Sequence, residues 1–448
     1  MIDKNKMTKF GLAALTVALT SAVAACSSGS SDPAPSSTST GTTAPKAEQP
    51  KEKEEIVIYA INGDTPESFE YRFGEELRKK FPEYDFKYLY SKQGSTLADM
   101  ITSKTRFDIT YHASGFYENF LIPNGLEYDM TELVKAQKVD MSRYEQTAID
   151  TMNQLGKGKI YSLPVYGNNT ILYYNKSIFD KFGTAYPANT LTWAQMSDLS
   201  KKLTRQDAGT QYYGFGFTPG LFTRMNPMSI ATIDLKTNTP TINTNDLWKT
   251  FIDRVFVQPF PQTGMFQTLP SITQFTKDKN LGMMAYLSSF FSLSIEELKQ
   301  VDWDVVPLPS FEDKPGVGSQ INSINFGVTN IAKNKEAAAK VVAYMGSDEY
   351  QLKLSKKGIM PVLKNQQIRD AIGSESVFKD KNLKTAVFSK QPAPVPEKTL
   401  YDADMITIYS NYGLEVWKGT MDANTAIRKA EEDAKKKIDE HIASGKYK

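Results

Sequence analysis

The hydrophobic pattern that begins near residue 55 alternates short apolar runs with segments of helical spacing. Residues 56–60, 86–90 and 107–111 are short runs rich in β-branched and aromatic residues, which predict buried strands. Residues 69–80 repeat an apolar side chain every fourth position and predict a helix, and residues 97–102 predict another. This order of strand, helix, strand, helix and strand indicates a parallel sheet with helices on its faces.

Two further helices are visible in the same pattern. The segment that opens at Thr192 and Trp193 predicts a helix through Leu203. Near the carboxyl terminus, small and aliphatic residues line one face of a long segment whose other face carries Glu and Lys; these are Ile427, Ala430, Ala434 and Ile438. The chain therefore predicts an α/β protein that ends in an amphipathic helix.

The first 26 residues follow the three-part pattern of a secretory signal. Three lysines up to Lys9 precede an apolar stretch over 10–23, and small residues lead to Cys26. Residues 23–26, VAAC, resemble the lipobox of bacterial lipoproteins, which implies a signal peptide at 1–25, cleavage before Cys26 and a lipid on its thiol. The alternative is a plain signal peptide in which Cys26 is incidental.

A polar tract separates this signal from the first predicted strand. Residues 27–54 are rich in Ser, Thr, Pro and Gly and end in charged residues, with no apolar residue larger than alanine. Such a composition cannot bury enough apolar surface to offset its ordering entropy. We predict that residues 26–54 are a lipidated cysteine and a disordered tether, followed by a folded domain over 55–448.

Composition narrows the chemistry of that domain. The 448 residues are 40% hydrophobic and 23% charged, and no later apolar run approaches the length of a membrane span. With one Cys, the chain cannot form a disulfide framework. With only two His besides, a zinc site or a catalytic pair built from Cys and His is not expected. Lys4, Lys6, Lys9 and Asp3 account for the net charge of +2, so the remainder is neutral and predicts no nucleic-acid partner.

A series of motifs then resembles one known family. Residues 158–164 read GKIYSLP, residues 173–176 read YYNK, and a predicted helix ends at 182–183, FG. In this order they resemble the extracellular solute-binding proteins that serve ABC importers, in the branch that contains maltose-binding protein.

Later segments match the same family in sequence order. They are 275–284 (FTKDKNLGMM), 303–309 (WDVVPLP), 325–338 (NFGV to NKEAA) and 358–362 (GIMPV). The first departs from the family pattern, with Asp278 in place of the usual Gly and Gly282 in place of the usual Ala. No single motif is specific, but their order across most of the chain supports the resemblance.

The resemblance implies a two-lobe, periplasmic-binding-protein-like fold of type II, in which each lobe has a central sheet with flanking helices. It implies lobe 1 at about 55–165 plus 318–378 and lobe 2 at about 166–317 plus 379–448. A hinge with several chain crossings joins them, and a ligand binds in the cleft between them.

Ligand contacts are expected where strand ends and crossings face that cleft. Amide and hydroxyl side chains suit the hydroxyls of a sugar, and aromatic rings suit its apolar face. The candidates are Asn62, Asp64, Thr65, His112, Ser114, Tyr166, Asn168, Asn169, Phe217, Phe222, Ser288, Ser289, Phe290, Asn322, Ser323, Asn325 and Tyr401.

Each candidate also has a structural alternative. An Asn is also a common turn or cap residue, and an aromatic residue is by default part of a core. His112 fits a ligand hydrogen bond or local structure equally well. Tyr173 and Tyr174 could bind ferric iron as phenolates, but their alternation along a strand favours packing on opposite faces. Trp193, Trp248 and Trp303 are assigned to packing, and Trp417 is left open.

The sequence thus predicts a lipid-anchored solute-binding protein on the outer face of the cell membrane. It is expected to act as a monomer that passes a sugar or oligosaccharide to ABC transporter permease subunits, with no enzyme activity, cofactor or metal. Peptide, polyamine and iron-chelate ligands stay open. The alternatives are an exported carbohydrate-active enzyme, which would need paired carboxylates in the cleft, and a sensor or adhesion lipoprotein with the same fold.

Overall fold

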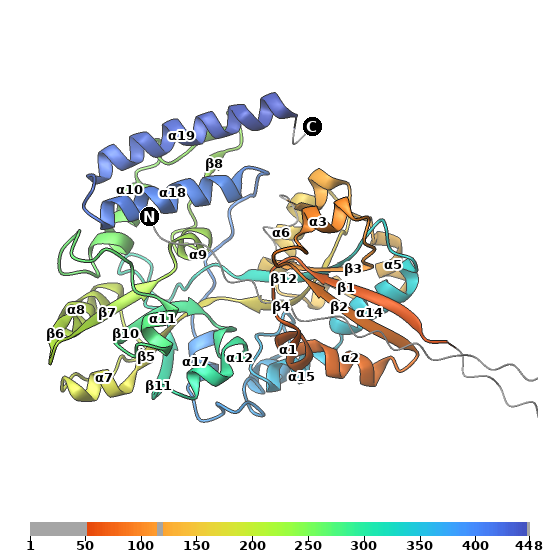
Figure 1. Cartoon of the computed structure of the whole chain (residues 1–448), viewed down its shortest axis with the longest axis horizontal. Coiled ribbons are helices and arrows are strands. Elements are labelled where there is room, and N and C mark those ends of the chain that lie inside the picture. Colours follow the sequence, from red (N-terminus) through yellow and green to blue (C-terminus); the bar gives the residue numbers. More distant parts are fainter. Residues whose placement is uncertain (1–51, 114–119, 446–448) are drawn as a thin grey trace, which may run out of the picture. The chain divides into compact units, whose positions relative to one another are not determined.

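The computed structural model describes residues 52–113 and 120–445, and contains two five-stranded sheets in that range (Figure 1). The first sheet has the order β2-β1-β3-β12-β4. Its strands are β1 (Glu54–Ala60), β2 (Tyr84–Tyr90), β3 (Ile109–Ala113), β4 (Leu163–Asn168) and β12 (Asn322–Val328). Strand β1 is parallel to β2 and β3, whereas β12 is antiparallel to β3 and β4.

The alternation of side chains along β1 explains why this sheet is covered on both faces. Ile56, Ile58 and Ala60 contribute to one hydrophobic core, and Val57 and Tyr59 contribute to the other. The helices associated with this sheet are α1 (Pro66–Phe69), α2 (Glu75–Lys80), α3 (Leu97–Thr102), α5 (Thr131–Ala136), α6 (Gln146–Gly156), α14 (Lys335–Met345), α15 (Asp348–Lys356) and α16 (Gln366–Asp370).

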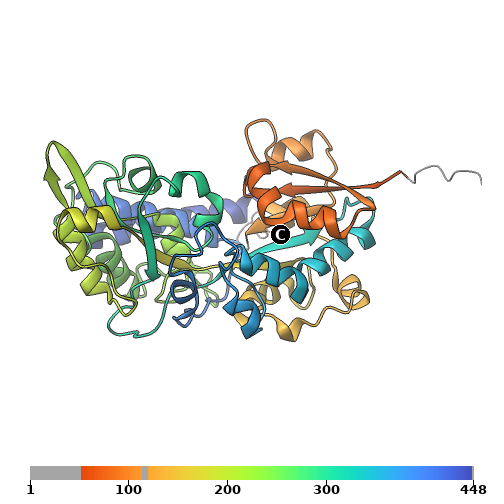
Figure 2. The same ribbon diagram turned by 90° about the horizontal axis from the view of Figure 1, so that it is seen from below.

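The second sheet has the order β11-β5-β10-β7-β6. Its strands are β5 (Thr170–Asn175), β6 (Arg205–Asp207), β7 (Thr210–Phe217), β10 (Leu281–Leu287) and β11 (Trp303–Pro307), and a small separate pair consists of β8 (Ile233–Asp234) and β9 (Thr239–Pro240). Strand β5 is antiparallel to both neighbours, and β10 is parallel to β7. In the orientation of Figure 2, the elements of the first sheet form one group and those of the second sheet form another.

Helices also cover both faces of the second sheet. They are α7 (Lys176–Lys181), α8 (Trp193–Leu203), α9 (Pro219–Arg224), α10 (Leu247–Ile252), α11 (Ile272–Thr276), α12 (Phe290–Leu293), α13 (Ile295–Leu298), α17 (Leu383–Phe388), α18 (Asp402–Trp417) and α19 (Ala423–Ser444). On β5, Leu172 and Tyr174 enter one core while Ile171 and Tyr173 enter the other. The prediction that Tyr173 and Tyr174 pack on opposite faces is therefore confirmed.

The predicted tryptophan packing and the terminal helix are also confirmed. Trp193, Trp248 and Trp303 are each 1% exposed, and Trp417, which the sequence left open, is buried against the ring of Phe260. The four predicted residues of the α19 face are all buried in the second-sheet core.

Three segments connect the two sheets. The first is immediate, because β4 ends at Asn168 in the first sheet and β5 begins at Thr170 in the second. The second runs from the end of β11 to the start of β12 and passes through Ser319. The third leads from α16 to α17, whose Leu383 and Ala386 join a second-sheet core, and on to α18.

The parallel pairing of the first three strands and the helix after β1 are confirmed, and the structure adds two details. The helix predicted over 69–80 is interrupted by a π-helical segment, Glu70–Gly74, between α1 and α2. The sheet is not wholly parallel, because β12 inserts antiparallel from a distant part of the chain. The signal, Cys26, most of the tether and Ser114 lie outside the described residues. Within the described residues, no helix is both long and apolar enough to cross a membrane.

Candidate functional site

The turn after β1 carries three of the predicted ligand contacts. Asn62 accepts a hydrogen bond at Oδ1 from the backbone N–H of Ala113 over 3.0 Å, which ties the end of β1 to the end of β3. Thr65 caps α1 by accepting from the backbone N–H of Ser68 at 3.4 Å. Asp64 lies between them, with 19% of its side chain exposed.

Asp64 is held by a buried arginine that sequence reasoning missed. The Arg72 guanidinium is fully buried and donates from Nη2 to Asp64 Oδ2 over 2.7 Å. Its Nη1 donates to the Tyr166 hydroxyl, also over 2.7 Å. The Tyr111 hydroxyl contacts both Asp64 Oδ2 and the Tyr166 hydroxyl, the latter at 2.9 Å. These four residues form what we call the Arg72 cluster.

Aromatic rings and burial shape the electrostatics of the Arg72 cluster. The guanidinium carbon lies 5.0 Å from the ring centre of Phe73, 5.5 Å from that of Tyr166 and 5.7 Å from that of Tyr111. Burial raises the pKa of the Tyr111 and Tyr166 hydroxyls, so both are neutral at pH 7. The cluster therefore contains one cation and one carboxylate. The sequence contains no signal for Arg72, because this residue lies in the helical segment Glu70–Gly74 among other charged residues.

His112 occupies the first sheet close to this turn. It is fully buried on β3, and its Nδ1 lies 3.1 Å from the carbonyl oxygen of Ala113. Burial lowers its pKa to about 4, so the ring is neutral at pH 7. Its neighbour Ser114, another predicted contact, falls outside the described residues.

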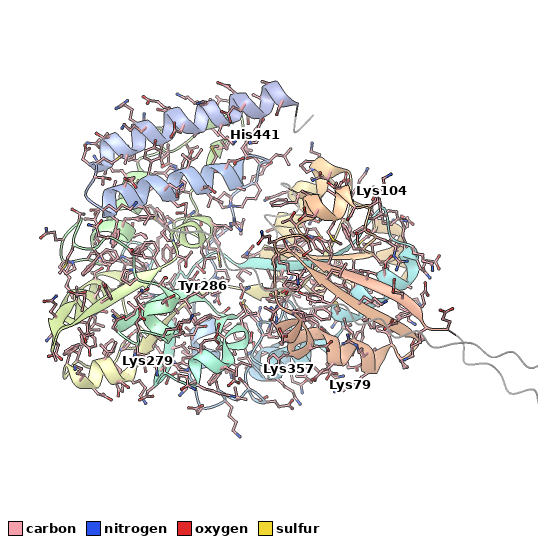
Figure 3. The ribbon with its side chains drawn as sticks, viewed as in Figure 1. Lys79, Lys104, Lys279, Tyr286, Lys357 and His441 are labelled. Atoms are coloured by element: carbon pink, nitrogen blue, oxygen red, sulfur yellow. The ribbon has the colours of Figure 1, made fainter. Side chains whose placement is uncertain are left out.

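The first crossing brings together four more predicted contacts. Asn168 accepts at Oδ1 from the backbone N–H of Ser289 over 3.1 Å. The Asn169 backbone N–H donates to Ser288 Oγ over 3.3 Å, and the Ser288 backbone N–H donates to the Asn169 carbonyl over 2.8 Å. The end of the first sheet is thus hydrogen-bonded to the turn that follows β10 in the second. Tyr286, near the end of β10, is partly exposed (Figure 3).

The first crossing is also bonded to the other two. Thr170 donates its backbone N–H to Ser319 Oγ over 2.8 Å, and Ser319 lies in the second crossing. Asn169 donates from Nδ2 to the carbonyl of Val387 over 2.8 Å, and Val387 is part of α17. The three segments between the sheets therefore meet in one hydrogen-bonded region.

Strand β12 carries the three remaining polar candidates. Asn322 is partly exposed and lies opposite Asn168 in the strand register. Ser323 and Asn325 are each 3% exposed, and Asn325 Nδ2 contacts the Ser323 carbonyl at 3.5 Å. The strand register shifts between Ile324 and Asn325, which is a β-bulge or similar irregularity. Such shifts re-aim side chains, so Asn322 and Asn325 need not follow simple alternation.

The aromatic candidates do not gather with the polar ones. Phe217 and Phe222 lie in the main core of the second sheet, in contact with each other and with Phe256 or Trp193. Phe290 packs edge-on against Tyr173 in the other core of that sheet. Their role as ligand contacts stays a prediction, and their burial favours packing instead.

Tyr401 precedes α18 and is partly exposed. Its ring centre lies 6.1 Å from that of His441, and its backbone N–H donates to Thr399 Oγ1 over 3.2 Å. In the described part of the chain, no group of three or more His, Cys, Asp or Glu side chains is placed to hold a metal ion.

Comparisons with known proteins identify the family. The family model for the bacterial extracellular solute-binding proteins matches residues 62–352, which is more than half of the chain. The chain therefore belongs to this family.

Curated relatives match over shorter spans. A 53-residue segment is 38% identical to the mannitol-binding protein of Pseudomonas aeruginosa and covers 12% of each chain. A 233-residue segment is 26% identical to a binding protein of Brucella abortus and covers 48% of this chain and 53% of the relative. The alignments thus span about half, or much less, of the relatives' own length.

Solved structures align over most of this chain. An ABC substrate-binding protein of Listeria monocytogenes in complex with cycloalternan aligns with a TM-score of 0.68 at 19% identity, over 86% of this chain and 99% of that one. A solute-binding protein of Thermotoga lettingae bound with α-D-tagatose aligns with a TM-score of 0.64 at 16% identity. One of Agrobacterium vitis with bound D-mannitol aligns with a TM-score of 0.59 at 18% identity. Both alignments cover 86% of this chain and 99% of the other chain. These likenesses establish the two-lobe, type II fold.

Proposed function

We propose that this protein captures a neutral, hydroxyl-rich solute, a sugar, sugar alcohol or oligosaccharide, between its two lobes and delivers it to an ABC transporter permease. Lobe 1 comprises about 55–165 plus 318–378, and lobe 2 about 166–317 plus 379–448. The solute stabilises the closed arrangement, and the permease binds that arrangement. No bond is made or broken.

The observation that carries this proposal is the ion pair between Arg72 and Asp64. Asp64 is the acidic side chain that the sequence places at the predicted cleft, and a buried cation neutralises it at 2.7 Å. A polyamine is a cation and would require uncompensated negative charge at this edge. A neutral polyol instead requires donors and acceptors, which the partly exposed Asn62 and Asn322 and the exposed Thr65 provide together with Asp64.

The same ion pair argues against the alternative that the protein is a glycosidase. Such enzymes generally use two carboxyl groups of different protonation that flank the scissile bond. Asp64 has its Oδ2 committed to Arg72 and Tyr111. The relatives bound to cycloalternan, α-D-tagatose and D-mannitol share the fold and are described as solute- or substrate-binding proteins, which supports binding without catalysis.

Binding is tested by calorimetric titration of the full chain with maltose, mannobiose, D-mannitol, D-tagatose and cycloalternan, and with spermidine and ferric ion. We expect a neutral saccharide or polyol to bind, and at 100 times its Kd to add about 2.7 kcal/mol to the free energy of unfolding. Asn322→Ala should weaken that binding, whereas Asn153→Ala, an exposed position on α6, should leave it unchanged. Binding of spermidine or ferric ion alone would contradict the proposal.

The anchor is proposed from the sequence pattern at residues 23–26. Cys26→Ala should release the protein from the membrane fraction, and Ser27→Ala should not. Delivery is tested by deleting the gene and measuring uptake of the identified solute. Unchanged uptake would favour the sensor or adhesion alternative.

A further inference from the structure

A small cavity lies where the three crossings between the sheets meet. Its volume is about 130 Å³, and its lining includes Thr170 from the first crossing, Ser319 from the second and Lys390 from the third. Of the predicted solute contacts, only Asn169 lines it. The cavity is therefore distinct from the Asp64 edge of the first sheet.

Hydrogen-bonding groups in its lining are buried without a protein partner. Asn169 Oδ1, Thr170 Oγ1 and Arg369 Nε have no hydrogen-bond partner among the described residues. Thr170 is 2% exposed, and its backbone N–H is bonded to Ser319 Oγ, so the residue is fixed while its hydroxyl is unsatisfied. Buried polar groups of this kind are costly unless a ligand or water satisfies them.

The charge of the lining is positive. Its three charged side chains are Glu145, Arg369 and Lys390, and Glu145 is ion-paired with Arg369. Lys390 has no carboxylate partner among the described residues, and its ammonium donates to Ser310 Oγ over 3.0 Å, which leaves two N–H bonds to direct elsewhere. Burial lowers the pKa of Lys390, consistent with an ammonium that lacks a counter-charge.

We propose that this cavity is a binding site for a small oxyanion of the hydrogen phosphate class, held by Lys390, Arg369 and Thr170. Lys390 and Arg369 Nε donate to anionic oxygens. Asn169 Oδ1 is an acceptor and so requires a ligand proton, which the P–OH of hydrogen phosphate supplies.

The volume of the cavity indicates a smaller ligand than the solute proposed for the cleft. A cavity of about 130 Å³ holds roughly four water molecules at their liquid volume. Pockets for drug-sized ligands are ~300 Å³ or larger. The cavity accommodates a compact oxyanion but not a disaccharide.

The test is calorimetric titration of the full chain with inorganic phosphate at constant ionic strength set by chloride. We expect a single phosphate to bind per chain, more tightly than sulfate, which has no proton to donate near neutral pH. Absence of phosphate binding into the millimolar range would overturn the proposal, as would binding of sulfate and phosphate with equal affinity.

Two variants locate the site. Thr170→Val is nearly isosteric and removes a hydroxyl that has no protein partner, so the unfolding temperature without phosphate should stay unchanged or rise slightly. Phosphate affinity should nonetheless fall about tenfold, the loss expected for one hydrogen bond to a charged group. Lys390→Gln should weaken phosphate binding by at least as much.

Matched controls are available on the surface. Thr273→Val on α11 and Lys379→Gln are at exposed positions, and neither residue lines the cavity. Both should leave phosphate binding unchanged. If the controls weaken binding as much as Thr170→Val and Lys390→Gln do, the phosphate lies elsewhere and the proposal is wrong.

Discussion

The guanidinium of Arg72 and the carboxylate of Asp64 form an ion pair over 2.7 Å in which the two partners differ sharply in exposure. The arginine is fully buried, and the aspartate is 19% exposed. The cation depends on this carboxylate for its charge compensation, whereas the carboxylate can reach water. The Tyr111 and Tyr166 hydroxyls add hydrogen bonds but no charge.

This asymmetry predicts different costs for the two single substitutions. Asp64→Asn leaves a buried cation uncompensated and should lower the free energy of unfolding by about 3–5 kcal/mol. Arg72→Met leaves a carboxylate that water can solvate, so its cost should be smaller. Denaturant unfolding of both variants and of the double variant checks the order. A larger loss for Arg72→Met than for Asp64→Asn would contradict it.

His112 predicts an acid-sensitive stability. The pKa of His112 is about 4 in the folded chain, whereas its ordinary value is 6.5. Between these two pH values the unfolded chain binds a proton at His112 that the folded chain does not bind. Stability should therefore fall as the pH decreases from about 6.5 to about 4, by an amount on the order of 3 kcal/mol.

The measurement for His112 is the unfolding free energy at several pH values for the native chain and for His112→Asn. The variant should lose stability less steeply than the native chain between pH 6.5 and pH 4. Parallel curves would show that other groups cause the acid sensitivity.

The hydrogen bond from the Ser289 backbone N–H to Asn168 Oδ1 links the end of β4 to the second sheet, and Asn168 is 2% exposed. Asn168→Ala leaves that amide without its acceptor and should cost about 1–3 kcal/mol. Hydrogen exchange should show faster exchange of the Ser289 amide. The exposed Asn153→Ala should change neither quantity, and unchanged protection at Ser289 in Asn168→Ala would refute the link.

Gly214 on β7 packs directly against α8. A Cβ at this position would overlap the backbone carbonyl of Ser200, which a rotamer change cannot relieve. Gly214→Ala should therefore destabilise by about 1–3 kcal/mol. At Gly220 on α9 the nearest heavy atom to an added Cβ is Ser410 Oγ at 3.8 Å, so Gly220→Ala should be neutral or stabilising. Thermal unfolding of both variants gives the comparison.

Local pattern was sufficient for many elements. The strand predicted at 56–60 lies inside β1, and the helix predicted at 97–102 coincides with α3. In α3, Thr96 and Asp99 form a capping box, so residues close in the chain determine where the helix starts. The strand predicted at 107–111 is displaced to Ile109–Ala113, and Asp108, just before it, is bonded to Val57 of β1 through both its backbone N–H and its carboxylate.

Some contacts of the candidate site could be predicted from the sequence, and others could not. Polar residues beside strands are predicted as contacts, and the structure joins Asn168 to Ser289 and Asn169 to Ser288 by hydrogen bonds, over sequence separations of 121 and 119 residues. Phe217 and Phe222 were chosen by the same reasoning, yet they lie in a core, because a pattern shows that a ring is apolar without showing what covers it. Their contribution to solute binding remains a prediction.

The sequence by itself determined the first three strands and the helices between them, α8, the opposite packing of Tyr173 and Tyr174, the buried face of α19, and the family, because each depends on residues close in the chain or on motifs in a fixed order. Only the tertiary structure decided the antiparallel insertion of β12, the pairing of Arg72 with Asp64 and Tyr166, and the cavity at the crossings. These depend on contacts between residues far apart in the chain, whose partners and burial no local pattern specifies.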